Sequence, residues 1–142
     1  MRAVTERVSG RVYSGFVSTL AEASLIADER TLLERFVREL QERLGPALHA
    51  VWLFGSRARG EAPLREYSDV DLLVLVDDAT WDGQVAVHAA LDAAARDRGL
   101  EALAWSFSVH INTPAWLAQR RAVRSFFIAE VDRDKIVVAG HA

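Results

Sequence analysis

The apolar residues of this chain recur in patterns that predict alternating helices and strands. Over residues 31–44 they follow a helical spacing, and Thr31 with Glu34 has the form of a capping box at a helix start. Gly45 and Pro46 end that helix. A second helix is predicted over residues 81–98. A third begins at residues 113–114, where Thr precedes Pro.

Strands are predicted between these helices. Two apolar runs without a polar break, residues 51–54 and 72–76, are typical of buried strands. Residues 101–112 alternate, which predicts a half-buried strand with one small, polar face. One side carries Leu103, Trp105, Phe107, Val109 and Ile111. A last short strand is predicted at residues 136–138.

Polar residues with distinctive chemistry gather around the two apolar runs. Gly55 and Ser56 follow the first run, and Asp69 and Asp71 begin the second. Glycine permits close approach of the backbone, and a helix opening after it would offer free N–H groups to phosphate. Strand alternation places both carboxylates on one face, where a hard divalent cation would relieve their repulsion. The pattern favours a metal-bound nucleoside triphosphate. The Walker A motif is absent, because no Gly-Lys-Ser/Thr ending follows Gly55.

The combination of Gly55-Ser56 with Asp69-Val70-Asp71 resembles the signature of the DNA polymerase β-like nucleotidyltransferase superfamily, and in particular its small prokaryotic members. The spacer between the two parts of the signature, residues 57–68, is slightly longer than in the commonest form of that signature. The resemblance implies an α/β (α+β) fold, in which helices pack on one face of a small mixed sheet and the other face is an open active site. It spans residues 31–140 and is specific only over residues 55–76. Two domain segments are therefore predicted: a partly helical N-terminal extension, residues 1–30, and a nucleotidyltransferase domain, residues 31–142.

The resemblance implies roles for particular residues. Asp69 and Asp71 are the predicted catalytic residues and ligands of Mg²⁺ or Mn²⁺, and the predicted nucleotide-binding residues are Gly55, Ser56, Arg57, Arg59 and Ser68. The family also uses a third carboxylate on a later strand. The strand predicted at residues 101–112 offers Ser106 and Ser108 at that position, together with His110, and no carboxylate on its polar face.

The sequence is compatible with two functions. One is Mg²⁺-dependent transfer of a nucleoside monophosphate from a nucleoside triphosphate to an acceptor hydroxyl, with release of pyrophosphate. The other is a catalytically weak nucleotide-binding or partner-binding module, similar to an antitoxin, that lacks the third carboxylate. Some small relatives are antitoxins that adenylylate a helical toxin, so we expect either a helical partner protein or a homodimer to take part in acceptor recognition.

The composition of the chain excludes some kinds of site and binding surface. The chain has 142 residues, no cysteine and a formal net charge of −3. Disulfides and thiolate metal sites are excluded, and the negative charge argues against a broad nucleic-acid-binding surface. Neither an apolar run of membrane-spanning length nor a signal peptide is recognisable, so we expect a cytoplasmic location without membrane contact.

Overall fold

A four-stranded mixed sheet forms the centre of the protein in a computed structural model that describes residues 7–8, 11–12, 20–61 and 69–142. The strand order is β5 (Phe107–Asn112), β4 (Val70–Val76), β3 (Leu48–Phe54) and β6 (Ile136–Gly140). β3 runs antiparallel to both β4 and β6, whereas β5 runs parallel to β4. The buried strands β3 and β4 are the two apolar runs that the sequence predicts.

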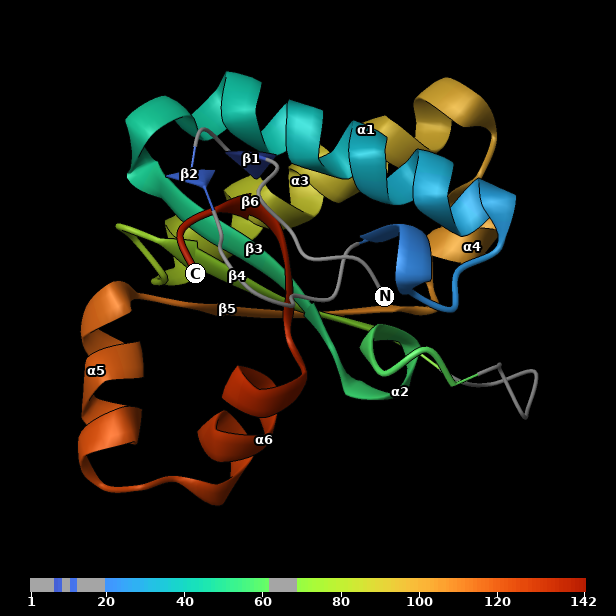
Figure 1. Ribbon diagram of the computed structural model, residues 1–142. Coiled ribbons are helices and arrows are strands. Elements are labelled where there is room, and N and C mark those ends of the chain that lie inside the picture. Colours follow the sequence, from blue (N-terminus) through green and yellow to red (C-terminus); the bar gives the residue numbers. More distant parts are fainter. Residues whose placement is uncertain (1–6, 9–10, 13–19, 62–68) are drawn as a thin grey trace.

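Two long helices cover one face of this sheet (Figure 1). They are α1 (Ala27–Leu44) and α3 (Trp81–Arg98). Their apolar sides meet alternate residues of β3 and β4, including Leu53 and Leu72, in the larger of two hydrophobic clusters. Burial of such side chains stabilises the layered arrangement by about 25 cal/mol for each Å² removed from water.

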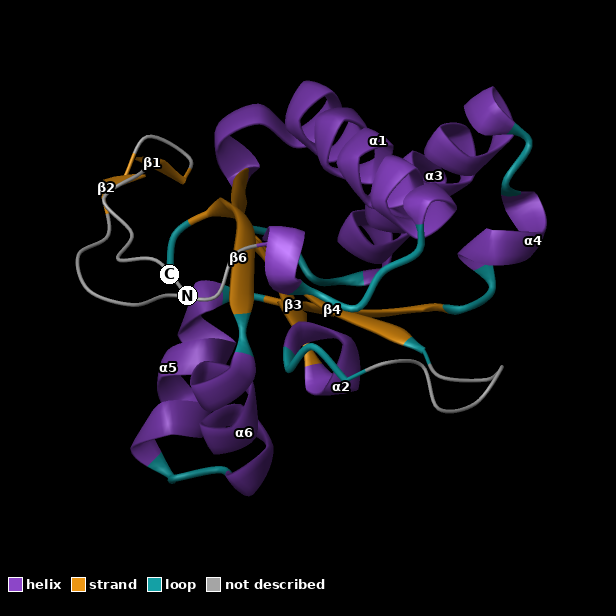
Figure 2. Ribbon diagram, turned by 45° about the vertical axis from the view of Figure 1, so that its right-hand side comes forward, coloured by secondary structure: helices purple, strands orange, loops and turns teal. Residues whose placement is uncertain are grey.

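A second pair of helices lies against the opposite face, as Figures 1 and 2 both show. They are α5 (Pro114–Ala122) and α6 (Phe126–Asp134). Leu117 and Ile128 from these helices pack against Trp52 and Leu73 in a separate hydrophobic cluster. The predicted mixed α/β fold is confirmed, but the open face is narrower than expected, because the apolar side chains of β3 and β4 on that face require their own cover.

The predicted strand at residues 101–112 is wrong in its first half. Residues 101–104 form the short helix α4 (Glu101–Ala104), and β5 begins only at Phe107. Trp105 lies in the turn between them and is 89% exposed, although alternation placed it on the buried side. The alternation within β5 itself holds, since Phe107, Val109 and Ile111 belong to or pack against the larger cluster.

The first long helix begins earlier than its sequence signal indicated. α1 starts at Ala27, and its first turn is closed by Glu29, whose Oε1 accepts a hydrogen bond from the Ile26 backbone N–H at 3.0 Å. Thr31 therefore lies inside the helix. Ala23 is buried in the larger cluster, so residues before position 31 contribute to the packed core.

Short elements complete the described chain. They are β1 (Arg7–Val8), β2 (Arg11–Val12), η1 (Leu20–Glu22), η2 (Gly45–Ala47) and α2 (Gly55–Ala58). Among the helices of the described part, none is long and apolar enough to cross a membrane.

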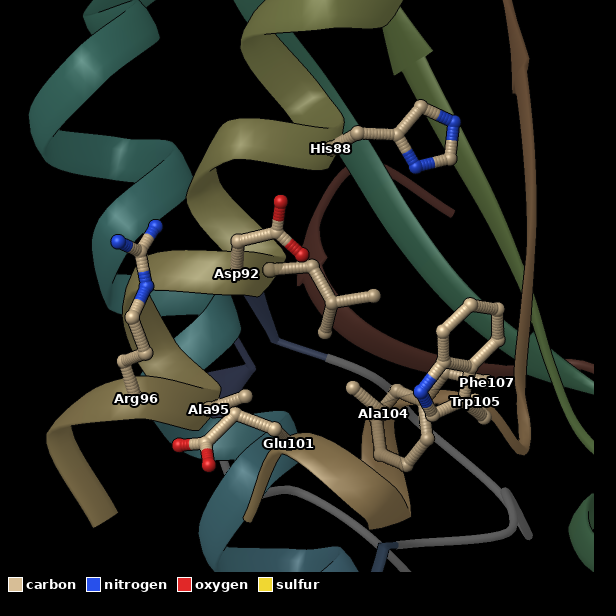
Figure 3. A pocket seen from close by; sticks show the side chains of 9 residues that line it. His88, Asp92, Ala95, Arg96, Glu101, Ala104, Trp105 and Phe107 are labelled. Atoms are coloured by element: carbon tan, nitrogen blue, oxygen red, sulfur yellow. The ribbon is translucent and has the colours of Figure 1, made fainter. Parts of the chain in front are cut away.

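A hollow of about 520 Å³ lies between α3, α4 and the start of β5 (Figure 3). His88 and Asp92 of α3 and the exposed Trp105 line it, and none of the predicted site residues does. The predicted aspartate Asp71 lies instead on the sheet face that α5 and α6 partly cover.

Candidate active site

The Gly-Ser turn lies directly against one of the two predicted catalytic aspartates. Gly55 follows the last residue of β3 and opens α2, with φ at +76°, a conformation that side chains other than glycine rarely adopt. Antiparallel pairing sets Phe54 opposite Asp71 on β4. A methyl group at position 55 would lie 2.6 Å from Asp71 Oδ2. Glycine is needed here for its backbone conformation and for the space that the carboxylate takes.

The two aspartates occupy the same end of the sheet. Asp69 immediately precedes β4 and is exposed, and Asp71 is half-buried on the face that also carries Leu73 and Leu75. The pKa of Asp71 is raised above its usual value, first by burial and then by the negative charge of Asp69. Smaller electrostatic effects of His110, Arg57 and Arg59 act in the opposite direction.

β5 brings Ser108 next to these carboxylates. In the parallel β4–β5 pair, Ser108 is the register partner of Asp71, and His110 is the partner of Leu73. Residues two apart on a strand share a face, so Ser108 and His110 lie on the Asp71 side of the sheet. Ser106 instead lies in the turn before β5, where its hydroxyl donates to the Leu103 carbonyl at 2.8 Å. Of the two serines predicted at the third position, only Ser108 has strand register with Asp71.

Arg57 is directed into the protein. Its guanidinium Nη1 donates to Glu29 Oε1 at 2.6 Å and to the Ser24 carbonyl at 3.0 Å, and both charged side chains are buried. These contacts join α2 to α1 and to the segment before it. Sequence alone cannot show this, because Arg57 and Glu29 are 28 positions apart.

Arg59 is directed toward α6. Its Nε donates to Glu61 at 2.7 Å, and its Nη1 donates to Asp134 at 3.0 Å. These two carboxylates raise the pKa of Arg59. The predicted nucleotide-binding roles of Arg57 and Arg59 stay predictions. Ser68, also predicted to bind nucleotide, lies outside the described residues.

With this geometry in place, comparison with known proteins identifies the family. Residues 33–126 match the model of the Nucleotidyltransferase domain family, which is more than half of the chain. The chain belongs to the nucleotidyltransferase domain family. The matched region includes Gly55, Asp69, Asp71 and Ser108, and the resemblance inferred from the sequence is confirmed.

A curated relative is similar over part of this region. The "Putative protein adenylyltransferase MJ1305" of Methanocaldococcus jannaschii is 47% identical over 51 residues, which are 34% of this chain and 33% of the relative. The matching segment therefore spans about a third of the length of that relative.

A solved structure also aligns with this nucleotidyltransferase domain. It is a crystal structure of a toxin-antitoxin with AMP-PNP, with a TM-score of 0.48 and 20% sequence identity. The alignment covers 76% of this chain and 73% of the other.

The donor atoms of the nucleotidyltransferase site suit a hard divalent cation. Asp69 and Asp71 offer carboxylate oxygens, and a cation bound to them would relieve the repulsion that, together with the larger effect of burial, raises the pKa of Asp71. Within the described residues there is no group of three or more His, Cys, Asp or Glu side chains placed to hold a metal. Mg²⁺ ordinarily binds through one or two carboxylates and completes its coordination with phosphate and water, so two carboxylates are sufficient.

Proposed function

We propose that this domain transfers a nucleoside monophosphate from a nucleoside triphosphate to an acceptor hydroxyl, with Mg²⁺ or Mn²⁺ as the cofactor. The observation that carries the proposal is the contact of the Gly55 turn with the Asp71 carboxylate. The β3–β4 pairing thereby holds the Gly55 turn beside the Asp71 carboxylate. This is the arrangement needed to bind a triphosphate through its phosphates and its cation at the same time.

In this proposal the residues have separate tasks. Gly55 and Ser56 hold the triphosphate, and Asp69 with Asp71 hold the cation. The bound cation would stabilise negative charge on the attacking and leaving oxygens. The acceptor hydroxyl gives its proton to a base and its oxygen forms a bond to the α-phosphorus. The bond from that phosphorus to the β-phosphate oxygen breaks, and pyrophosphate leaves with the electron pair.

The nucleotide and the acceptor belong to the proposal as well. The name of the archaeal relative, a protein adenylyltransferase, supports ATP as the nucleotide and a protein hydroxyl as the acceptor. The predicted helical partner protein would then be the acceptor or would present it.

A second candidate function follows from Ser108. The register partner of Asp71 on β5 is a serine and not a carboxylate. This favours, as the alternative, a domain that binds a nucleotide and a partner protein but transfers slowly or not at all.

Label transfer separates the two functions. The protein is incubated with each of the four α-labelled nucleoside triphosphates, with Mg²⁺ or Mn²⁺, and with a cell protein extract, total RNA or an aminoglycoside as acceptor. Transfer that is abolished in Asp69→Ala and Asp71→Ala but kept in Asp92→Ala supports the transferase. Asp92 is a suitable control because it is an exposed aspartate on α3, outside the site.

Thermal unfolding gives the complementary measurement. A ligand that binds the native state raises the melting temperature, so a Mg²⁺-nucleotide should stabilise the protein under either function. Stabilisation without transfer supports the binding module. The absence of both stabilisation and transfer contradicts both functions.

A further inference from the structure

β5 places one titratable side chain on the site face, and this is His110. We infer that His110 accepts the proton of the acceptor hydroxyl, in place of the third carboxylate that the family resemblance predicts. The inference rests on the proposed transferase function and concerns the residue that completes its site.

The ring of His110 is turned toward the position beside Asp71. His110 and Ser108 are two apart on β5 and share its site face, and Ser108 is the register partner of Asp71. Nε2 of His110 lies 3.5 Å from Ser108 Oγ. A basic nitrogen thus lies near the place where an acceptor hydroxyl would approach a phosphate bound at the Gly55 turn, beside a cation held by Asp71.

Two phenylalanines hold the imidazole ring in this orientation. Its centroid lies 5.5 Å from the ring of Phe54 and 5.7 Å from the ring of Phe127, and these two rings meet edge to face at 5.6 Å. Phe54 is the residue before Gly55, and Phe127 belongs to α6. The three rings connect the turn, β5 and α6. A catalytic side chain needs such packing to keep a productive geometry.

The proposed step balances without any further reactant. The acceptor O–H proton moves to Nε2 of neutral His110, and the oxygen forms its bond to the α-phosphorus as pyrophosphate leaves. Among the described residues, the charged groups on the surrounding elements are Asp69 and Asp71 at the start of β4, Arg57 of α2, Arg59 directly after it, and Glu130 and Asp134 of α6. His110 is itself exposed, so the accepted proton can pass to water.

Two substitutions separate proton transfer from ring packing. His110→Asn removes the basic nitrogen, and His110→Phe removes it while keeping an aromatic ring against Phe54 and Phe127. We expect both to lower kcat for label transfer by about 10²- to 10⁴-fold, with KM for the nucleotide nearly unchanged. In both, the acid side of the pH–rate profile should lose the limb that His110 contributes and keep the one that Asp71 contributes. The matched control is His88→Asn, an exposed histidine on α3 that should leave the rate unchanged.

A carboxylate at position 108 should replace the lost base. We expect Ser108→Asp to restore much of the rate in the His110→Asn background, because position 108 is in register with Asp71. Ser106→Asp in the same background should restore nothing, since that side chain faces the turn at Leu103.

The outcomes distinguish this inference from the proposed function. If the wild type transfers label and His110→Phe transfers it at the wild-type rate, the inference is wrong while the transferase function stands. It is also wrong if His110→Asn loses thermal stabilisation by Mg²⁺-ATP together with its rate, because His110 then serves binding or packing. If the wild type transfers no label to any acceptor, the proposed function fails first and the inference fails with it.

Discussion

At the scale of single residues, Gly55 has two separate reasons to be glycine. Its φ is +76°, and a Cβ atom would meet the Asp71 carboxylate at 2.6 Å. We expect Gly55→Ala to lower the free energy of unfolding by about 1–3 kcal/mol through backbone strain. Displacement of Asp71 should also reduce thermal stabilisation by Mg²⁺-ATP.

Gly99 provides the control for Gly55. It too has a positive φ, +67°, but a Cβ atom there would meet nothing within 4 Å. Chemical denaturation of Gly99→Ala should show a lower free energy of unfolding through backbone strain. Thermal stabilisation of this variant by Mg²⁺-ATP should be unchanged. Equal nucleotide stabilisation in the two alanine variants would contradict the role given to the Gly55–Asp71 contact.

Asp71 should make the metal-free protein less stable at neutral pH. Its pKa is raised in the native state, so the native protein retains a proton that the unfolded chain has already released. Stability therefore falls as the pH rises from the ordinary carboxylate range through the raised pKa, and the loss is complete above it. Asp71→Asn should be more stable than the wild type at pH 7 in EDTA, and the difference should vanish below about pH 4.

Denaturation at several pH values measures this difference, and Asp78→Asn tests its sign. Hydrogen bonds from the Thr80 hydroxyl and backbone N–H lower the pKa of Asp78, so its contribution to stability is present at neutral pH and lost as the pH falls. Asp78→Asn should be less stable than the wild type at pH 7. If Asp71→Asn were also less stable at pH 7 without metal, the assigned cause of the pKa shift would be wrong.

At the scale of secondary-structure elements, a buried ion pair joins α2 to α1. Glu29 and Arg57 are 4% and 5% exposed, and their side chains meet at 2.6 Å. Removing one partner leaves the other charge buried without this opposite charge. We expect Glu29→Ala and Arg57→Ala each to lower the free energy of unfolding by about 3–5 kcal/mol.

A double-mutant cycle measures the coupling between Glu29 and Arg57. The double variant should lose clearly less than the sum of the single losses, because the two side chains are in direct contact. The surface pair Glu39–Arg43 on α1 is the control, and there we expect a coupling of about 0.5 kcal/mol or less. Additive losses at Glu29 and Arg57 would contradict the pairing.

At the scale of the whole molecule, α5 and α6 build a second core that supports the site. Ile128 is 1% exposed and belongs to the cluster around Trp52, whereas Phe126 on the same helix is 78% exposed. Ile128→Ala should lower the free energy of unfolding by about 2–5 kcal/mol through the cavity it leaves. Phe126→Ala should change it by about 0.5 kcal/mol or less.

This prediction extends to nucleotide binding. α6 carries Phe127, which packs on Phe54, and Asp134, which binds Arg59 directly after α2. Loosening α6 should therefore reduce thermal stabilisation by Mg²⁺-ATP in Ile128→Ala and leave it unchanged in Phe126→Ala. A full nucleotide response in Ile128→Ala would show that the site does not depend on the second core.

Local sequence patterns were sufficient to predict β3 and β4, the two central strands of the sheet. Residues 51–54 and 72–76 are apolar without a break, and such runs form buried strands whichever layers cover them. The pattern failed at residues 101–104, where alternation indicated a strand and the chain forms α4. An alternating pattern shows which side chains are apolar, but it does not show whether a neighbouring strand forms hydrogen bonds with the segment. The pairing of β4 with β5 begins only at Val70 and Phe107, so residues 101–104 have no strand partner in β4.

The sequence by itself determined the family and the spacing of its signature, because Gly55-Ser56 and Asp69-Val70-Asp71 depend only on short-range geometry: a turn after one strand and alternation along the next. Only the tertiary structure decided that Arg57 is buried against Glu29, that α5 and α6 narrow the open face, and that Ser108 rather than Ser106 lies beside Asp71. Each of these depends on contacts between segments far apart in the chain. Strand register and helix packing determine such contacts, and neither is encoded in the spacing of residues within one segment.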